Sequence, residues 1–241
     1  MLFYFTNYMD FIRNLEQLKQ EIENHDLLEI VSFEIAPPAS EATIIEIEQK
    51  CQITLDKELK EFYRQMNGCH LHWQLKPLTE DEYDEKVYDK FGDYEPDLED
   101  DDENPFAQIK INSLEVCFLE DWFDYSESYD NTIVFKGQEY VEHQFSKKVK
   151  ILDSFSVFSC IAYVIDKEVE DSPLMMLSGH YADWYNSRLL NFNNYWQILM
   201  KSKGINEIKD DIFGEADGYK QPPILNLDDF GENLSPKLFE K

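Results

Sequence analysis

Basic residues are scarce in this chain of 241 residues. Lys and Arg together number 22 against 50 Asp and Glu, which gives a formal net charge of −28. A surface of this sign repels nucleic acid and anionic membranes, and it speeds encounter with positively charged proteins. We therefore expect a basic protein as the partner, and neither nucleic acid nor a membrane. The alternative explanation of the charge is solubility alone.

Glycine-rich motifs and long apolar runs are missing as well. The chain has 8 glycines and contains no P-loop, no dinucleotide-binding glycine pattern, no GxSxG and no HExxH. We therefore predict that it is not an enzyme and holds no cofactor. No apolar run approaches the roughly 20 residues that cross a bilayer. The apolar opening MLFYFTNY lacks a basic start and a cleavage signal. We interpret it as an extra strand or an extension before Met9, and we expect a cytosolic protein.

The cysteines do not form a motif either. They lie far apart, with no CxxC pair, at positions Cys51, Cys69, Cys117 and Cys160. Each has apolar neighbours, and a disulfide framework is improbable in a chain of this size and spacing. We predict four buried free thiols.

Several segments have the apolar periodicity of amphipathic helices. The clearest is TLDKELKEFYRQMNG, residues 54–68, where Asp56 is a suitable N-cap and Gly68 a suitable C-terminal residue. Its predicted buried stripe consists of Leu55, Leu59, Phe62, Tyr63 and Met66. Further helices are predicted over residues 10–22, over residues 41–51 after the N-cap Ser40, and over residues 192–204.

Strand patterns dominate between residue 68, at the end of the third predicted helix, and the last of these helices. CHLHWQL alternates Leu71, Trp73 and Leu75 with polar residues, as a half-buried strand does. Further strands are predicted over residues 114–119, 131–136, 149–153 and 160–166, and PLMMLSG is another candidate. Helices, then strands, then a helix predict an α+β fold with a mostly antiparallel sheet flanked by helices.

Two acidic segments are candidates for partner contact. Residues 80–103 hold 14 acids against Lys86 and Lys90, and their end, DLEDDDE, is expected to be solvated. EDWFDYSESYD, residues 120–130, mixes aromatics with five acids, as an interface for a basic surface would. A strand end with ordinary aromatic burial explains the second segment equally well. The predicted contact residues are Asp100, Asp101, Asp102, Glu120, Asp121, Trp122, Asp124 and Tyr125.

The pair of histidines in CHLH is the one candidate for metal chemistry. His70 and His72 share one face of the predicted strand beside Cys69, and His180 is a candidate further ligand. Exposed strand histidines without a metal are the plainer interpretation. An enzyme or metal protein using the Cys69-His70-His72 region therefore stands only as an alternative.

The order of these motifs resembles the SUKH superfamily, which includes cell-wall regulators of the Smi and Knr kind. The helix predicted over residues 41–51 has the Ile-x-x-x-Glu pattern of the family's first helix, at Ile44 and Glu48. The helix over residues 54–68 ends in Asn-Gly, at Asn67 and Gly68, as the family's second helix does. Asp56 replaces a proline that usually follows the leucine at the second helix start. FSVFSCIAYVID and the helix containing Phe192 and Tyr195 resemble the distal half of the family. The resemblance covers about residues 40–203.

The resemblance implies a non-enzymatic α+β interaction domain. It divides the chain into an N-terminal helical extension at 1–35, a SUKH-like domain at 36–204 with an acidic insert at 80–103, and a C-terminal tail at 205–241. Bacterial domains of this kind are often immunity proteins that neutralise toxins, many of them nucleases, whereas fungal ones act in signalling and cell-wall regulation. We expect an immunity protein that binds a basic, nuclease-type toxin, with a fungal-type regulatory scaffold as the alternative.

Overall fold

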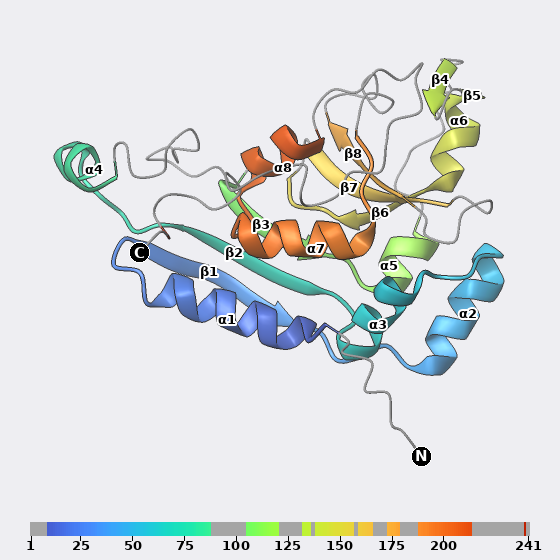
Figure 1. Cartoon of the computed structure of the whole chain (residues 1–241), viewed down its shortest axis with the longest axis horizontal. Coiled ribbons are helices and arrows are strands. Elements are labelled where there is room, and N and C mark those ends of the chain that lie inside the picture. Colours follow the sequence, from blue (N-terminus) through green and yellow to red (C-terminus); the bar gives the residue numbers. More distant parts are fainter. Residues whose placement is uncertain are drawn as a thin grey trace.

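A computed structural model describes residues 9–87, 105–120, 132–135, 138–156, 159–165, 173–178, 188–213 and 239 of the chain. Its centre is a six-stranded sheet in the order β1-β2-β3-β6-β7-β8 (Figure 1). Every neighbouring pair in this sheet is antiparallel. The strands are β1 (Leu28–Ile35), β2 (Cys69–Leu75), β3 (Ala107–Ile111), β6 (Val149–Asp153), β7 (Ser159–Val164) and β8 (Leu174–Ser178). The predicted α+β fold with a mostly antiparallel sheet is confirmed.

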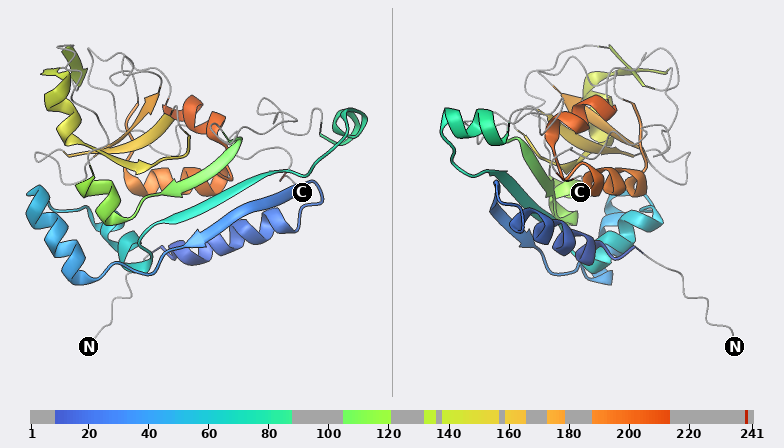
Figure 2. Two further views of the ribbon diagram at one scale, coloured as in Figure 1. Left: turned by 180° about the vertical axis from the view of Figure 1, so that it is seen from behind. Right: turned by 60° about the vertical axis from the view of Figure 1, so that its left-hand side comes forward.

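A small hairpin and the helices complete the described part of the fold. The hairpin consists of β4 (Thr132–Phe135) and β5 (Gln138–Val141). The longer helices are α1 (Phe11–Glu23), α2 (Glu41–Cys51), α3 (Lys57–Gln65), α7 (Phe192–Lys201) and α8 (Asn206–Phe213), and the shorter ones are α4 (Glu80–Lys86), α5 (Leu114–Leu119), α6 (Glu142–Phe145) and the 3-10 helix η1 (Ser146–Lys148). Helix α4 lies at one end of the molecule and α2 at the other (Figures 1 and 2). Among the described helices, none combines the length and the apolar character that crossing a bilayer requires.

Two apolar clusters occupy the two faces of the sheet. In β7, Ile161 and Tyr163 belong to the main cluster, whereas Ala162 and Val164 belong to a second one beneath the β4–β5 hairpin and α6. This alternation follows from the two-residue period of a strand. The main cluster lies under α1, α3 and α7, which contact one another.

Four aromatic rings from three helices form the centre of the main cluster. We call Phe11, Phe62, Phe192 and Trp196 the aromatic cluster. The ring centroids of Phe62 lie 5.4 Å from Phe11, 5.3 Å from Phe192 and 5.5 Å from Trp196. All four side chains are at most 2% exposed. The contacts of Phe62 with Phe11 and Phe192 are edge-to-face, and such contacts add to the free energy gained by burying the rings.

The predicted helix over residues 54–68 is confirmed as α3. The Asp56 carboxylate accepts a hydrogen bond from the Leu59 amide at 2.8 Å, so Asp56 is the N-cap. The helix ends at Gln65, and Gly68 follows with a φ of +102°. A side chain at Gly68 would place its Cβ 2.7 Å from the Ile111 carbonyl oxygen, so the start of β2 requires glycine there.

The strand predicted over residues 114–119 is wrong, because LEVCFL forms helix α5. Ser113 caps it by accepting the Val116 amide at 3.3 Å, and the Asn67 side chain accepts the Leu114 amide at 2.8 Å. Leu114, Cys117 and Phe118 are buried at helical spacing. Two capped amides therefore favour the helix over the β propensity of the segment.

Several elements arise where the sequence predicted none, and β1 and α8 are two of them. Strand β1 pairs with β2 along the edge of the sheet, and α8 follows α7 in the segment predicted as a tail. Residues of α1, β1 and α8 belong to the same apolar cluster as α3 and β2. The division at residues 35/36 and 204/205 stays a prediction, whereas the core itself is continuous across both positions. The opening residues 1–8 lie outside the described residues.

All four cysteines are free thiols, as predicted. Cys69 and Cys117 are buried, whereas Cys51 and Cys160 are only partly buried. Burial raises the pKa of the Cys117 thiol to about 12, so this group stays protonated at neutral pH.

Candidate partner-binding surface

Most of the predicted contact residues lie outside the described part of the chain. This holds for Asp100, Asp101, Asp102, Asp121, Trp122, Asp124 and Tyr125. Glu120 lies within the described residues. It directly follows Leu119, the last residue of α5, and its side chain is exposed. The structure therefore locates one of the eight predicted residues, and the grouping of all eight stays a prediction.

The first part of the acidic insert forms helix α4. Thr79 and Glu82 form a capping box, in which each side chain binds the backbone amide of the other residue. The first turn holds Glu80, Asp81 and Glu82, whose charges favour a helix N-terminus. Tyr83 packs against the main apolar cluster and Val87 belongs to it. The acids of α4 are thus held on an anchored helix.

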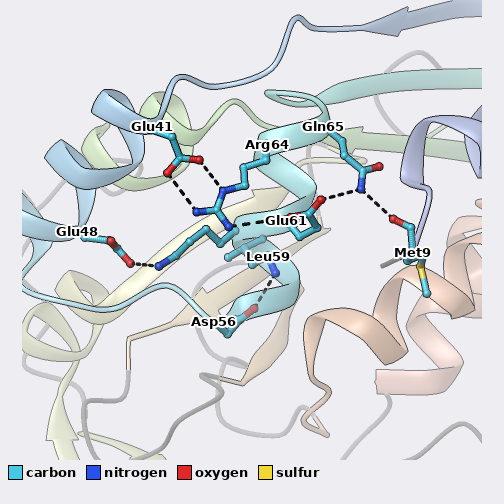
Figure 3. Close-up of polar contacts among 9 residues, drawn as sticks. Met9, Glu41, Glu48, Asp56, Leu59, Glu61, Arg64 and Gln65 are labelled. Carbon is cyan, nitrogen blue, oxygen red and sulfur yellow. Dashed lines mark hydrogen bonds and ion pairs between the residues drawn. The ribbon is translucent and has the colours of Figure 1, made fainter. Parts of the chain in front are cut away.

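Basic side chains of α3 are paired with acids of α2 (Figure 3). The guanidinium of Arg64 contacts the Glu41 carboxylate through two nitrogens, at 2.6 and 3.1 Å, and this holds the pKa of Glu41 below its usual value. Lys60 lies 2.7 Å from Glu48, which also accepts the Leu55 amide at 2.9 Å. The glutamate of the family pattern therefore fixes the α2–α3 connection.

Most of the other described basic residues also have partners within the chain. Lys50 pairs with Glu46, Lys203 with Glu21 and Lys209 with Asp153, and Lys76 donates to the Asp26 carbonyl at 2.7 Å. No basic partner is found, among the described residues, for the carboxylates of Glu58, Glu80, Asp81, Asp84 and Glu120. The charge that the surface offers to a partner is therefore negative.

A polar row crosses β1, β2 and β3 on one face of the sheet. Glu34, His70 and Lys110 lie opposite one another in register, and the next row consists of Ser32, His72 and Gln108. Glu34, His70 and Lys110 also line a groove of about 680 Å³ at the end of these strands, next to Asn67 and Val116.

The His70 ring is held in its neutral form. The Gln108 side-chain amide lies 2.9 Å from Nε2, and the Ser32 hydroxyl oxygen lies 3.2 Å from Nδ1. Gln108 donates to Nε2, and Nδ1–H donates to Ser32, which satisfies one tautomer of the uncharged ring. Partial burial and then the nearby Lys110 charge lower the pKa of His70.

The CHLH segment does not bring its three candidate ligands together. Cys69 belongs to the main apolar cluster, on the face opposite His70. His72 is only 8% exposed, so the interpretation of both histidines as exposed was wrong for His72. His180 lies outside the described residues. Within the part that is described, no group of three or more His, Cys, Asp or Glu could hold a metal ion.

Acidification is expected to destabilise the native chain through His70. Its folded-state pKa lies below the unfolded value of about 6.5, so the unfolded state binds the proton first as the pH falls. This contribution to stability is complete above about pH 6.5 and is lost as the pH falls towards the folded-state pKa. Urea unfolding of His70→Gln should therefore lose less stability between about pH 7 and pH 5 than the wild type does. Parallel stability curves for the two proteins would contradict this expectation.

A buried polar group that the sequence did not reveal lies between the sheet and helices α7 and α8. The ammonium of Lys209 lies 3.4 Å from the Asp153 carboxylate and 3.9 Å from the centroid of the Phe155 ring, and it donates to the Gln108 carbonyl. Asp153 also accepts the Tyr195 hydroxyl at 2.5 Å and the Lys110 amide at 2.9 Å.

The environment of this group explains its pKa shifts and its role. Burial lowers the pKa of Lys209, against the opposing effect of Asp153, and burial followed by Asp153 raises the pKa of Tyr195. Both charged side chains are 0% exposed. A partner or substrate cannot reach them, so the group anchors α8 to the sheet. One sign of this buried group was visible in the sequence, which is that Lys209 adjoins the apolar stripe of Ile208, Ile212 and Phe213.

The SMI1/KNR4 family (SUKH-1) matches residues 38–159, which run from the segment before α2 to the start of β7. A comparison with curated proteins finds no significant match. The match covers half of the chain and includes α2, α3, the polar rows of β2 and β3, and α5. This chain belongs to the SMI1/KNR4 family (SUKH-1).

Proposed function

We propose that this chain is an immunity protein that binds and neutralises a basic, nuclease-type toxin. Membership of the SUKH family supports a non-catalytic domain in general. The observation that carries the proposal further is the charge of −28 combined with basic residues that mostly have intramolecular partners. The surface charge is thus available to a cationic partner.

Physical chemistry favours a nuclease among basic partners. The surface of a nuclease that binds phosphates is positively charged, because phosphate contacts dominate the affinity for nucleic acid. Carboxylates at comparable density compete for the same surface. A strongly negative inhibitor also gains a fast encounter rate, since opposite charges steer the two proteins together before they touch.

Binding kinetics at several salt concentrations test the proposal. The probe is the purified product of the neighbouring gene in the source genome, immobilised and assayed for nuclease activity. The association rate constant should fall by about tenfold or more as salt rises from about 50 to 500 mM, while the dissociation rate constant changes less. Nuclease activity should fall to background at a one-to-one ratio. A salt-independent association rate, or a nuclease that the chain does not inhibit, would refute the proposal.

Two sets of variants separate steering from close contact. Neutralising Asp100, Asp101 and Asp102 together should mainly slow association. Replacing Trp122 or Tyr125 by alanine should mainly speed dissociation, because desolvated aromatics tend to carry interface free energy. Unchanged dissociation of both aromatic variants would place the contact elsewhere.

A matched pair of triple variants tests whether steering depends on position. Glu80→Gln, Asp81→Asn and Asp84→Asn remove three charges from α4. Glu16→Gln, Asp26→Asn and Glu58→Gln remove the same number from α1, the α1–β1 connection and α3. Steering towards the acidic insert predicts a larger loss of association rate for the α4 set. Equal losses would mean that net charge alone acts.

A further inference from the structure

Phe239 returns from the far end of the chain to the main apolar cluster. Its ring centroid lies 5.8 Å from that of His25 and 6.1 Å from that of Trp73, the latter in an edge-to-face arrangement. The Lys203 ammonium lies 5.3 Å from the Phe239 centroid, within the range of a cation–π contact. We call the site formed by His25, Trp73 and Lys203 the aromatic notch.

The aromatic notch is held together by bonds that do not involve Phe239. The indole N–H of Trp73 donates to the Lys203 carbonyl at 2.7 Å. Lys203 has a left-handed φ of +57°, and its ammonium pairs with Glu21. The Leu27 amide donates to Nδ1 of His25 at 3.2 Å. These contacts join α1, β2 and the turn after α7 and fix the His25 ring in the α1–β1 connection, so the notch is held without Phe239.

We propose that the aromatic notch is a binding site for an aromatic side chain carried on a linear peptide segment, and that Phe239 is its ligand in cis. Three features define the ligand class. The indole edge and the imidazole ring accept an aromatic face or edge, and the ammonium of Lys203 favours a π system over an aliphatic group. Phe239 is only half-buried, so the notch does not fully enclose its ligand.

Phe239 is attached to the notch only through a long stretch of sequence. Phe239 lies 26 residues beyond Phe213, the last residue of α8, so the notch and its ligand are joined by a long connection. The residues of the notch all lie outside this connection, so a peptide with the same residues should bind in trans once Phe239 is removed. This inference is independent of the proposed toxin partner.

Fluorine NMR of the full-length chain labelled with 5-fluorotryptophan tests the first half of the proposal. The chain has four tryptophans, and the Trp73 signal is assigned with a Trp73→Phe variant. Phe239→Ala should shift the Trp73 signal and leave that of Trp196, which lies in the aromatic cluster, unchanged. Phe230→Ala removes a similar ring from the same terminal region as a matched control and should not shift Trp73. An unmoved Trp73 signal in Phe239→Ala would overturn the proposal.

Peptide rescue tests whether the notch binds its ligand in trans. A peptide of residues 234–241, LSPKLFEK, added to Phe239→Ala should return the Trp73 signal towards its wild-type position, whereas the same peptide with alanine in place of Phe239 should not. The wild-type chain should bind the peptide at least about tenfold more weakly, because its own Phe239 occupies the notch in most molecules. Failure of the phenylalanine peptide to move the Trp73 signal at millimolar concentration, or rescue by the alanine peptide, would overturn the proposal.

Discussion

Replacing Phe62 by alanine is expected to lower the free energy of unfolding by about 3–5 kcal/mol. The side chain is 0% exposed and contacts all three other rings of the aromatic cluster. Its removal would leave a cavity between α1, α3 and α7 that three rigid rings cannot close. Denaturant unfolding followed by circular dichroism measures the change.

The control for this prediction is a large apolar residue that the fold leaves at the surface. Leu119, at the end of α5, is 43% exposed, so Leu119→Ala should cost well under about 1 kcal/mol. Equal stabilities of Phe62→Ala and the wild type would remove α3 from the core and contradict the described packing.

Replacing Lys209 by methionine is expected to cost about 3–5 kcal/mol, because it leaves the Asp153 carboxylate buried without a counter-charge. Methionine keeps most of the length and the apolar contacts of the lysine stem, so a packing defect contributes little. The same unfolding measurement reports the change, with Lys201→Met on the exposed face of α7 as the matched control.

A double variant separates the charge from the shape of this buried group. Asp153→Asn removes the negative charge. Its one oxygen can still accept the Lys110 amide, and its NH2 group, in place of the second oxygen, can donate to the Tyr195 hydroxyl. Lys209→Met combined with Asp153→Asn should therefore be more stable than the sum of the two single changes implies. Strict additivity would show that the ion pair is not the source of the cost.

The helices that carry the aromatic cluster could be predicted from the sequence because their apolar residues repeat with the helical period. Helix α3 shows this most clearly, since its cap and its stripe both follow from neighbouring residues. Helix α5 was misjudged because the β propensity of LEVCFL outweighed the local N-cap Ser113, and the second capping bond comes from Asn67, which lies 47 residues away from Leu114. Strand β1 was missed since Glu29 and Glu34 interrupt its apolar pattern at the edge of the sheet.

The site was less predictable than the fold. Net charge follows from composition, so an acidic surface could be expected. The pairing of Arg64 with Glu41, or of Lys209 with Asp153, depends on tertiary contacts between residues 23 and 56 positions apart. The same is true of the aromatic notch, whose residues come from three separate segments of the chain. No local pattern signals such convergence.

The joining of α1 to α7 has a consequence for synthesis on the ribosome. The indole N–H of Trp196 donates to the Asn14 side chain at 3.2 Å across 182 positions of sequence. At about 5–20 residues per second, roughly 10–40 s pass between the emergence of the two helices. During that interval Phe11, Leu15 and Leu18 have no α7 to cover them. A nascent chain arrested before α7 should therefore bind a ribosome-associated holdase chaperone and be cleaved rapidly by protease, whereas the released full-length chain should resist both.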